Sequence, residues 1–113
     1  MVKILITESD NYSKEAIRIL ESTGKVYKKN LTYQNLLKQI SGYDVIITKL
    51  GINFDKAILS KARKLKIIAS PTTGLDHLDQ SYLKKRNVKI LSLKGEKVFL
   101  EKISATAELN FGL

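Results

Sequence analysis

The sequence predicts an α/β fold: a doubly wound, parallel, five-stranded sheet in the flavodoxin-like order, with helices on both faces in a Rossmann-like three-layer α/β/α arrangement. Short apolar runs alternate with longer amphipathic stretches along the chain, as expected for repeated strand–helix units. The apolar runs are continuous, which indicates strands that are buried on both faces, as in a parallel sheet. The length of 113 residues fits one domain of this kind.

Strands are expected where short runs of apolar and β-branched residues are bounded by turn residues. The clearest of them, Asp44 to Thr48, reads as a central strand. The predicted strands, in chain order, are Val2 to Thr7, Val26 to Tyr27, Asp44 to Thr48, Lys66 to Ser70 and Val88 to Leu91.

Helices are expected in the amphipathic stretches between these strands. The first, Ser13 to Thr23, should end at Gly24 in a left-handed cap. Thr32 is expected to cap a second helix, and Asp79 a short later one. The apolar stripes predicted to face the core are Ala16, Ile17 and Leu20; Leu36, Leu37 and Ile40; Phe54, Ala57, Ile58 and Ala62; and Tyr82 with Leu83.

The last part of the chain departs from the strand–helix repeat. The stretch from Ser92 to Lys102 looks like a linker, and Ser104 can cap a helix whose first turn contains Glu108. This predicted helix has run only about two turns when the sequence reaches Leu113, which indicates truncation.

The composition limits the classes of protein. Without cysteine the chain forms no disulfide framework and no thiolate metal site, and one histidine makes any metal cluster implausible. No apolar run approaches the ~20 residues that span a membrane, and the N-terminus does not resemble a signal peptide. These features favour a soluble protein of the reducing cytoplasm.

The formal net charge of +9 makes anions the expected partners. The densest basic stretches are Lys61 to Lys66 and Lys84 to Arg86, where polar ends of surface helices are expected. A solvated surface is the favoured interpretation, because these stretches have no interleaved aromatic residues for stacking on bases. Specific nucleic-acid binding is therefore not expected.

Ligands of an open parallel sheet bind beyond the carboxyl ends of its strands. The most distinctive loop there runs from Pro71 to Asp76. Gly74 can adopt a positive φ and so aim successive N–H groups at one anion. A plain turn, in which Asp76 and Asp79 cap backbone groups, remains an equal alternative. Lys49, just past the central strand, could supply a cation for a carboxylate.

Catalytic machinery is not evident. His77 is the only histidine, it lacks a partner nucleophile, and a structural or surface role is favoured for it. The dinucleotide motif needs three glycines in G-x-G-x-x-G spacing, and no two glycines here lie close enough. We therefore expect no catalytic residue, no metal and no dinucleotide site.

Two other classes stay open on the residues alone. A free-standing flavodoxin-like binding module would have the same sheet. Its phospho-accepting receiver variant is disfavoured, because Thr48 and Lys49 stand where an aspartate would end the central strand. A basic nucleic-acid-binding protein would explain the charge and predicts steeply salt-dependent binding.

Residues 65–79, Leu-Lys-Ile-Ile-Ala-Ser-Pro-Thr-Thr-Gly-Leu-Asp-His-Leu-Asp, form a strand–loop–helix stretch that resembles the signature of the D-isomer-specific 2-hydroxy-acid dehydrogenases. Three further segments resemble that family in the expected order. Asp44 to Leu59 is similar to the preceding strand, loop and helix, and Lys84 to Leu91 to the next helix and strand. Thr106 to Leu109 resembles the start of the helix that enters the nucleotide-binding domain.

This resemblance implies a flavodoxin-like substrate-binding (catalytic) domain at residues 1–103 and the start of the interdomain helix at residues 104–113. The full-length enzyme would be a homodimeric, NAD- or NADP-dependent oxidoreductase that interconverts a D-2-hydroxy acid and its 2-keto acid. Its catalytic arginine, glutamate and histidine would belong to the missing nucleotide-binding domain. This chain alone is therefore expected to be inactive and to hold no cofactor.

The resemblance also assigns site residues. The backbone N–H groups of one loop match those that hold the substrate carboxylate in relatives, and the loop comprises Thr72, Thr73, Gly74 and Leu75. Lys49 falls where the family often has an arginine, although lysine lacks the bidentate fork. Thr106 matches a hydroxyl residue near the nicotinamide side of the cofactor. Gly95 to Lys97 replaces the common Gly-x-Asn, so the substrate stays unassigned.

Overall fold

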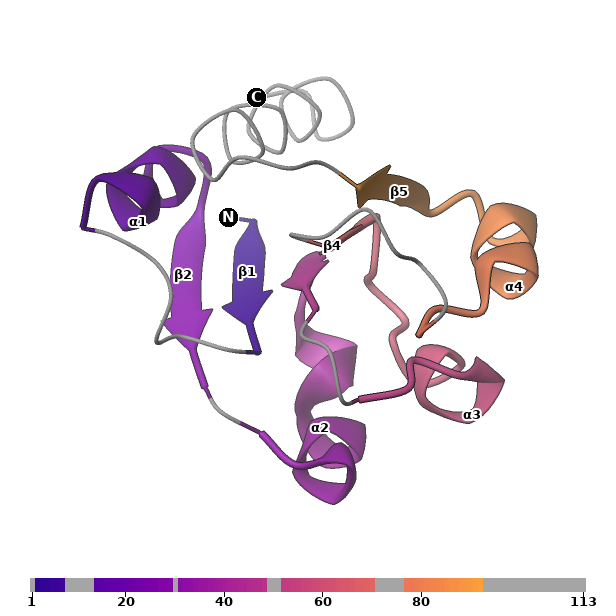
Figure 1. Cartoon of the computed structure of the whole chain (residues 1–113). Helices are drawn as coiled ribbons and strands as arrows, with labels where there is room; N and C mark the ends of the chain where they lie inside the picture. The colour runs from indigo at the N-terminus through magenta and orange to yellow at the C-terminus, as the bar shows by residue number, and fades with distance from the viewer. Residues whose placement is uncertain (1, 8–13, 30, 49–51, 71–76, 93–113) are drawn as a thin grey trace.

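The computed structural model describes residues 2–7, 14–29, 31–48, 52–70 and 77–92 (Figure 1). Its strands form one five-stranded sheet in the order β2-β1-β3-β4-β5, and every pair of neighbours is parallel. This confirms the predicted fold class and the flavodoxin-like order. The strands are β1 (Lys3–Ile6), β2 (Lys25–Lys28), β3 (Val45–Ile47), β4 (Ile67–Ser70) and β5 (Lys89–Ser92).

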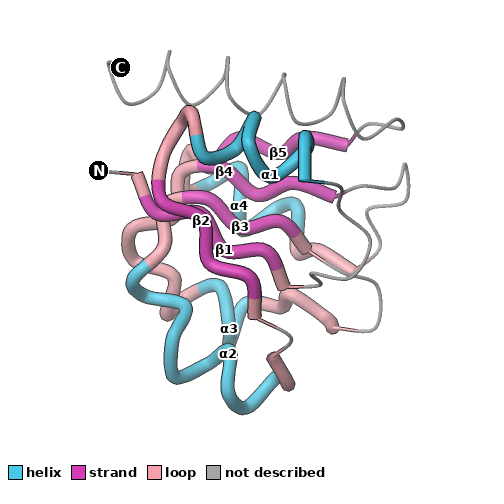
Figure 2. The backbone as a smooth tube through the Cα atoms, turned by 90° about the vertical axis from the view of Figure 1, so that its left-hand side faces the viewer, coloured by secondary structure: helices cyan, strands magenta, loops and turns pink. Residues whose placement is uncertain are grey.

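The helices lie on both faces of this sheet, as Figure 2 shows for α1 on one side and α2 and α3 on the other. The described helices are α1 (Lys14–Glu21), α2 (Tyr33–Gln39) with the short 3-10 helix η1 (Ile40–Gly42), α3 (Lys56–Leu59) and α4 (Gln80–Lys85). Within the described ranges, no helix is long and apolar enough to cross a membrane. The predicted helix after Ser104 and the predicted boundary at residue 103 lie outside the described residues.

Two hydrophobic clusters account for the layers, because alternate residues of each strand point to opposite faces. On one face, Leu5, Ile46 and Ile68 of the sheet pack with Leu36, Ile58 and Leu83 of α2, α3 and α4. On the other, Ile4, Val45 and Ile67 pack with Leu20 of α1. All these side chains are fully buried. Burial of both faces explains why the strands are continuous apolar runs in the sequence.

Side-chain caps begin three of the helices. Thr32 accepts a hydrogen bond from the backbone N–H of Asn35, and Asp79 accepts one from that of Tyr82, which confirms both predicted caps. Asp55 begins α3 in the same way. That helix is shorter than the predicted stripe, and Ala57 of the stripe is exposed while Leu59 is buried instead.

The predicted left-handed cap at Gly24 is wrong. The backbone of Gly24 is not left-handed, and its lack of a side chain serves a close approach instead: a Cβ there would lie 2.2 Å from the carbonyl oxygen of Val2. The left-handed residue of the described chain is Asn87, with φ of 60° after α4. The N–H of Val88 then bonds to the carbonyl of Leu83, which closes the end of α4 in a Schellman-type turn.

Candidate functional site

Buried hydroxyl side chains mark the carboxyl ends of three adjacent strands. Thr7 follows β1, Thr48 follows β3 and Ser70 ends β4, and none is more than 2% exposed. Thr7 donates to the carbonyl of Ile47 through both its N–H, at 3.2 Å, and its hydroxyl, at 2.8 Å. The N–H of Thr48 donates to Ala69 of the next strand at 2.8 Å. The edge of the sheet where ligands are expected is therefore hydrogen-bonded and fixed.

A side-chain hydrogen bond joins two connections at this edge. Thr48 Oγ1 and His77 Nε2 are 2.9 Å apart, so the hydroxyl either donates to a neutral ring or accepts from its N–H. The imidazole also contacts the ring of Phe54 edge to face, with 6.4 Å between centroids. His77 is half-buried by these neighbours.

Backbone hydrogen bonds tie the same two connections together. Phe54 forms an isolated parallel bridge with Leu78. The N–H of Phe54 donates to His77 at 2.7 Å, and the N–H of Asp79 donates to Phe54 at 3.0 Å. Residues 49–51 lie between Thr48 and this bridge, and residues 71–76 lead into His77. The structure thus holds together the anchors of the two loops in which the sequence places the substrate contacts.

A cavity of about 240 Å³ opens beside these anchors. Its lining consists of Asn53, Phe54, Asp55, His77, Leu78 and Asp79. Both carboxylates already cap helices, and Asp55 also accepts a hydrogen bond from the hydroxyl of Tyr33 at 2.9 Å. The backbone N–H of Ile58, and then the Tyr33 hydroxyl, lower the pKa of Asp55, while the same carboxylate raises the pKa of Tyr33. Both carboxylates of this rim are therefore already used within the domain, and neither is a contact for an acid anion.

The predicted site residues themselves are not described by the structure. Lys49, Thr72, Thr73, Gly74, Leu75 and Thr106 all lie outside the described residues. Thr48, which precedes Lys49, and His77, two residues after Leu75, are described and are in contact. Sequence reasoning missed this contact and the Tyr33–Asp55 hydrogen bond. The available signal was the hydroxyl residue that closes each of three strands.

The described residues do not provide a dinucleotide or metal site. Both described glycines, Gly24 and Gly42, precede strands, at the amino edge of the sheet, whereas a dinucleotide fingerprint follows a strand. No group of three acidic, cysteine or histidine side chains in the described ranges is arranged to hold a metal ion. What the described part of this edge shows is a set of hydrogen bonds between its strand ends and the connections that follow them.

The sequence of this chain is similar to one family of known proteins. The sequence profile of the D-isomer specific 2-hydroxyacid dehydrogenase family, catalytic domain, matches residues 4–98. A D-3-phosphoglycerate dehydrogenase of Methanocaldococcus jannaschii is 39% identical over 80 residues, which are 70% of this chain and 15% of that protein. A hydroxypyruvate reductase of Thermotoga maritima is 28% identical over 115 residues, covering 100% of this chain and 36% of that protein. The chain thus spans a minor part of the curated relatives that it matches.

Solved structures share the fold. A Pyrococcus horikoshii protein aligns with a TM-score of 0.77 at 22% identity, over 84% of this chain and 28% of that one. A D-lactate dehydrogenase of Aquifex aeolicus, solved with NAD and lactic acid, aligns with a TM-score of 0.68 at 16% identity, over 80% of this chain and 27% of that one. At these identities the structures establish the fold, and the sequence profile establishes the family. The chain belongs to the D-isomer specific 2-hydroxyacid dehydrogenase family, of which it carries the catalytic domain.

Proposed function

We propose that this chain is the substrate-binding half of an NAD- or NADP-dependent oxidoreductase that interconverts a D-2-hydroxy acid and its 2-keto acid. The observation that carries the proposal is the Thr48–His77 hydrogen bond, with the Phe54–Leu78 bridge beside it. Together they hold the ends of the connections at residues 49–51 and 71–76 against one rigid sheet edge. A site that positions a small acid needs such fixed anchors.

Within this proposal the substrate carboxylate is held by the loop of residues 72–75. The backbone N–H groups around Thr73, Gly74 and Leu75, next to the hydroxyl of Thr72, would donate to it, and the ammonium of Lys49 would balance its charge. Thr106 would approach the nicotinamide side of the cofactor. The task of this half is to orient the acid and to complement its charge.

The cofactor and the proton-transferring residues would belong to a nucleotide-binding half in the full-length enzyme. The described residues do not fit a dinucleotide, since their glycines lie at the opposite edge of the sheet. A bound nicotinamide would exchange a hydride with C2 of the acid. We further propose that the full-length enzyme is a cytoplasmic homodimer and that this chain alone is inactive.

Titration of the isotope-labelled chain with D-lactate and D-glycerate, followed by ¹H–¹⁵N NMR, tests the site. Saturable shifts are expected at residues 72–75 and at Thr48. Replacing Lys49 by glutamine should weaken binding about tenfold, as loss of one charge-assisted contact does. The control Lys84→Gln removes the same charge from α4 and should change affinity little. Equal effects of the two substitutions, or shifts confined to other surfaces, would overturn the proposed site.

A further inference from the structure

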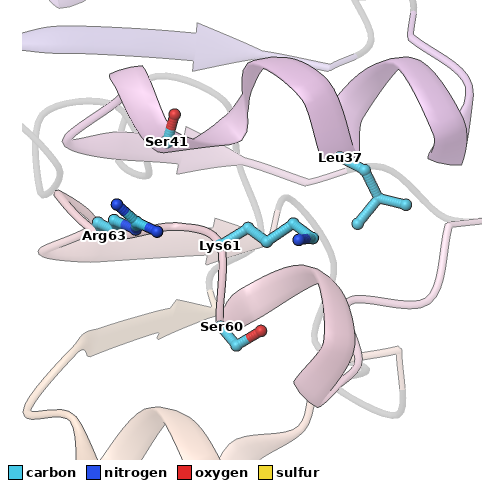
Figure 3. Close-up of a pocket in the computed structure, with 5 residues that line it drawn as sticks. All are labelled: Leu37, Ser41, Ser60, Lys61 and Arg63. Atoms are coloured by element: carbon cyan, nitrogen blue, oxygen red, sulfur yellow. The ribbon is translucent and has the colours of Figure 1, made fainter.

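A second hollow is lined by residues that do not belong to the candidate site. Its volume is about 490 Å³, and it is lined by Leu37, Ser41, Ser60, Lys61 and Arg63 (Figure 3). Ser41 lies between α2 and β3, and residues 60–63 lie between α3 and β4. Because these connections lead back to strand starts, the hollow opens at the amino edge of the sheet. Its volume falls within the range of about 300–1,000 Å³ that is usual for small-molecule sites.

The polar groups of this hollow are those of an anion site. The lining includes a lysine, an arginine and two serines, and no carboxylate. Figure 3 shows the Lys61 side chain extending between α2 and α3 beneath Leu37, with Arg63 on the Ser41 side. Lysine and arginine side chains are hydrogen-bond donors only, and arginine presents a planar fork that matches phosphate.

Lys61 and Arg63 are not needed to bind the free backbone carbonyls where α3 ends. Carbonyls at the end of α3 and in the connection after it are already bonded by another residue: the guanidinium of Arg86 donates to Leu59 at 2.5 Å and to Ala62 at 2.7 Å. Within the part of the chain that the structure describes, the side chains of Lys61 and Arg63 form no hydrogen bond or ion pair. Both residues are exposed. Two positive charges therefore remain available to a ligand.

Further lysines extend the positive field along the same edge. Lys3 pairs with Lys25 at the starts of β1 and β2, and Lys66 immediately precedes β4. All three are exposed. Asp44 is the acidic residue between them, and one of its carboxylate oxygens already accepts the backbone N–H of Lys3 at 2.9 Å. At physiological salt, charges interact over a screening length of about 8 Å.

We propose that this hollow binds a small phosphorylated molecule by its phosphate group. A phosphate monoester carries a charge of roughly −1.5 to −2 at neutral pH and three acceptor oxygens, which matches the two cations and the hydroxyl of Ser41. The Ser60 hydroxyl already donates to the carbonyl of Ala57 at 2.9 Å. A carboxylate would balance only one of the two charges. Leu37 gives the organic part of such a ligand an apolar surface to contact. The proposal shares no residue with the candidate site, so it stands or falls separately from the proposed function.

The test is a titration of the labelled 113-residue chain with inorganic phosphate and with glycerol 3-phosphate at constant ionic strength. Saturable amide shifts are expected at residues 37, 41 and 60–63, with tighter binding of glycerol 3-phosphate because of Leu37. The double variant Lys61→Gln with Arg63→Gln should weaken both by about tenfold or more. Arg63→Lys, which keeps the charge and loses the fork, should give an intermediate loss.

The matched control is the double variant Lys84→Gln with Lys85→Gln, which removes the same two charges from exposed positions of α4. It should change affinity less than about twofold, since distant surface charges are screened. Equal losses in the two double variants would show diffuse attraction and overturn the site. Shifts at the carboxyl edge alone, or no saturation, would also overturn it. Thermal melts establish that each variant is folded, and the single variants replace any that is not.

Discussion

Removal of the Thr48 hydroxyl tests whether the two candidate loops depend on their anchor. Thr48→Val keeps the shape of the side chain and removes only the hydrogen bond of 2.9 Å to His77. Thr48 is 2% exposed, so the methyl group that valine adds is buried and does not increase the exposed apolar surface. The loss is then that of one hydrogen bond, with one imidazole nitrogen left without its partner.

The magnitude follows from burial of the two partners. A lost hydrogen bond costs about 1 kcal/mol, and a fully buried orphaned group would raise this to roughly 3 kcal/mol. His77 is only half-buried, so water can reach its ring and the lower figure applies. We expect the free energy of unfolding to fall by about 1 kcal/mol, which corresponds to roughly 4 °C in Tm for a domain of this size.

Measuring ligand affinity shows whether the Thr48–His77 hydrogen bond positions the loops for binding or only stabilises the fold. Thr48→Val should weaken D-2-hydroxy acid binding several-fold at temperatures where the variant is fully folded, because residues 71–76 lose one fixed end. Thr48→Ser retains the hydroxyl and should restore affinity. Chemical denaturation, ligand titration by NMR and the ¹⁵N shifts of the His77 ring measure the three effects. An unchanged affinity in Thr48→Val, with an altered His77 ring signal, would refute the reasoning.

Three further predictions concern stability and pH. Gly24→Ala should lower the free energy of unfolding by about 1–3 kcal/mol, since its Cβ would lie 2.2 Å from the carbonyl oxygen of Val2. Gly42→Ala should be nearly neutral, because the space around Gly42 is open. Urea denaturation of the two variants compares these effects. Arg86→Met keeps the aliphatic stem and loses the bonds to the carbonyls of Leu59 and Ala62, so the free energy of unfolding should fall by about 2–3 kcal/mol. The exposed Lys85→Met should cause almost no loss, and an equal loss in both variants would contradict the bridging role. The lowered pKa of Asp55 means that its contribution is present above the unfolded pKa and lost as pH falls through the folded pKa. Asp55→Asn should therefore lose less stability than the parent chain between about pH 5 and pH 3, and parallel pH profiles would show that this carboxylate is not responsible.

Local chemistry determined the elements of the fold. Continuous apolar runs such as Val45–Ile47 require burial on both faces, and the caps at Thr32 and Asp79 act within three residues of themselves. These signals depend on neighbours in the sequence, so the strands and the helix starts at Thr32 and Asp79 could be predicted. The order of the strands in the sheet is not a local property, and it was predicted by analogy with flavodoxin-like domains. The substrate contacts proposed for Lys49, residues 72–75 and Thr106 stay predictions, since these residues lie outside the described ranges.

Tertiary structure alone decided the contacts between distant segments. Thr48 and His77 are 29 residues apart, and only the parallel pairing of β3 and β4 brings them to one edge. Gly24 is required by a strand that begins more than a helix away, so it looked like a helix cap while its real constraint is the Val2 carbonyl. The same holds for Lys61 and Arg63, which look like the solvated end of a helix until Arg86, from another helix, is seen to occupy the carbonyls there. A sequence records which groups are available, and the packing of elements decides which of them are already used.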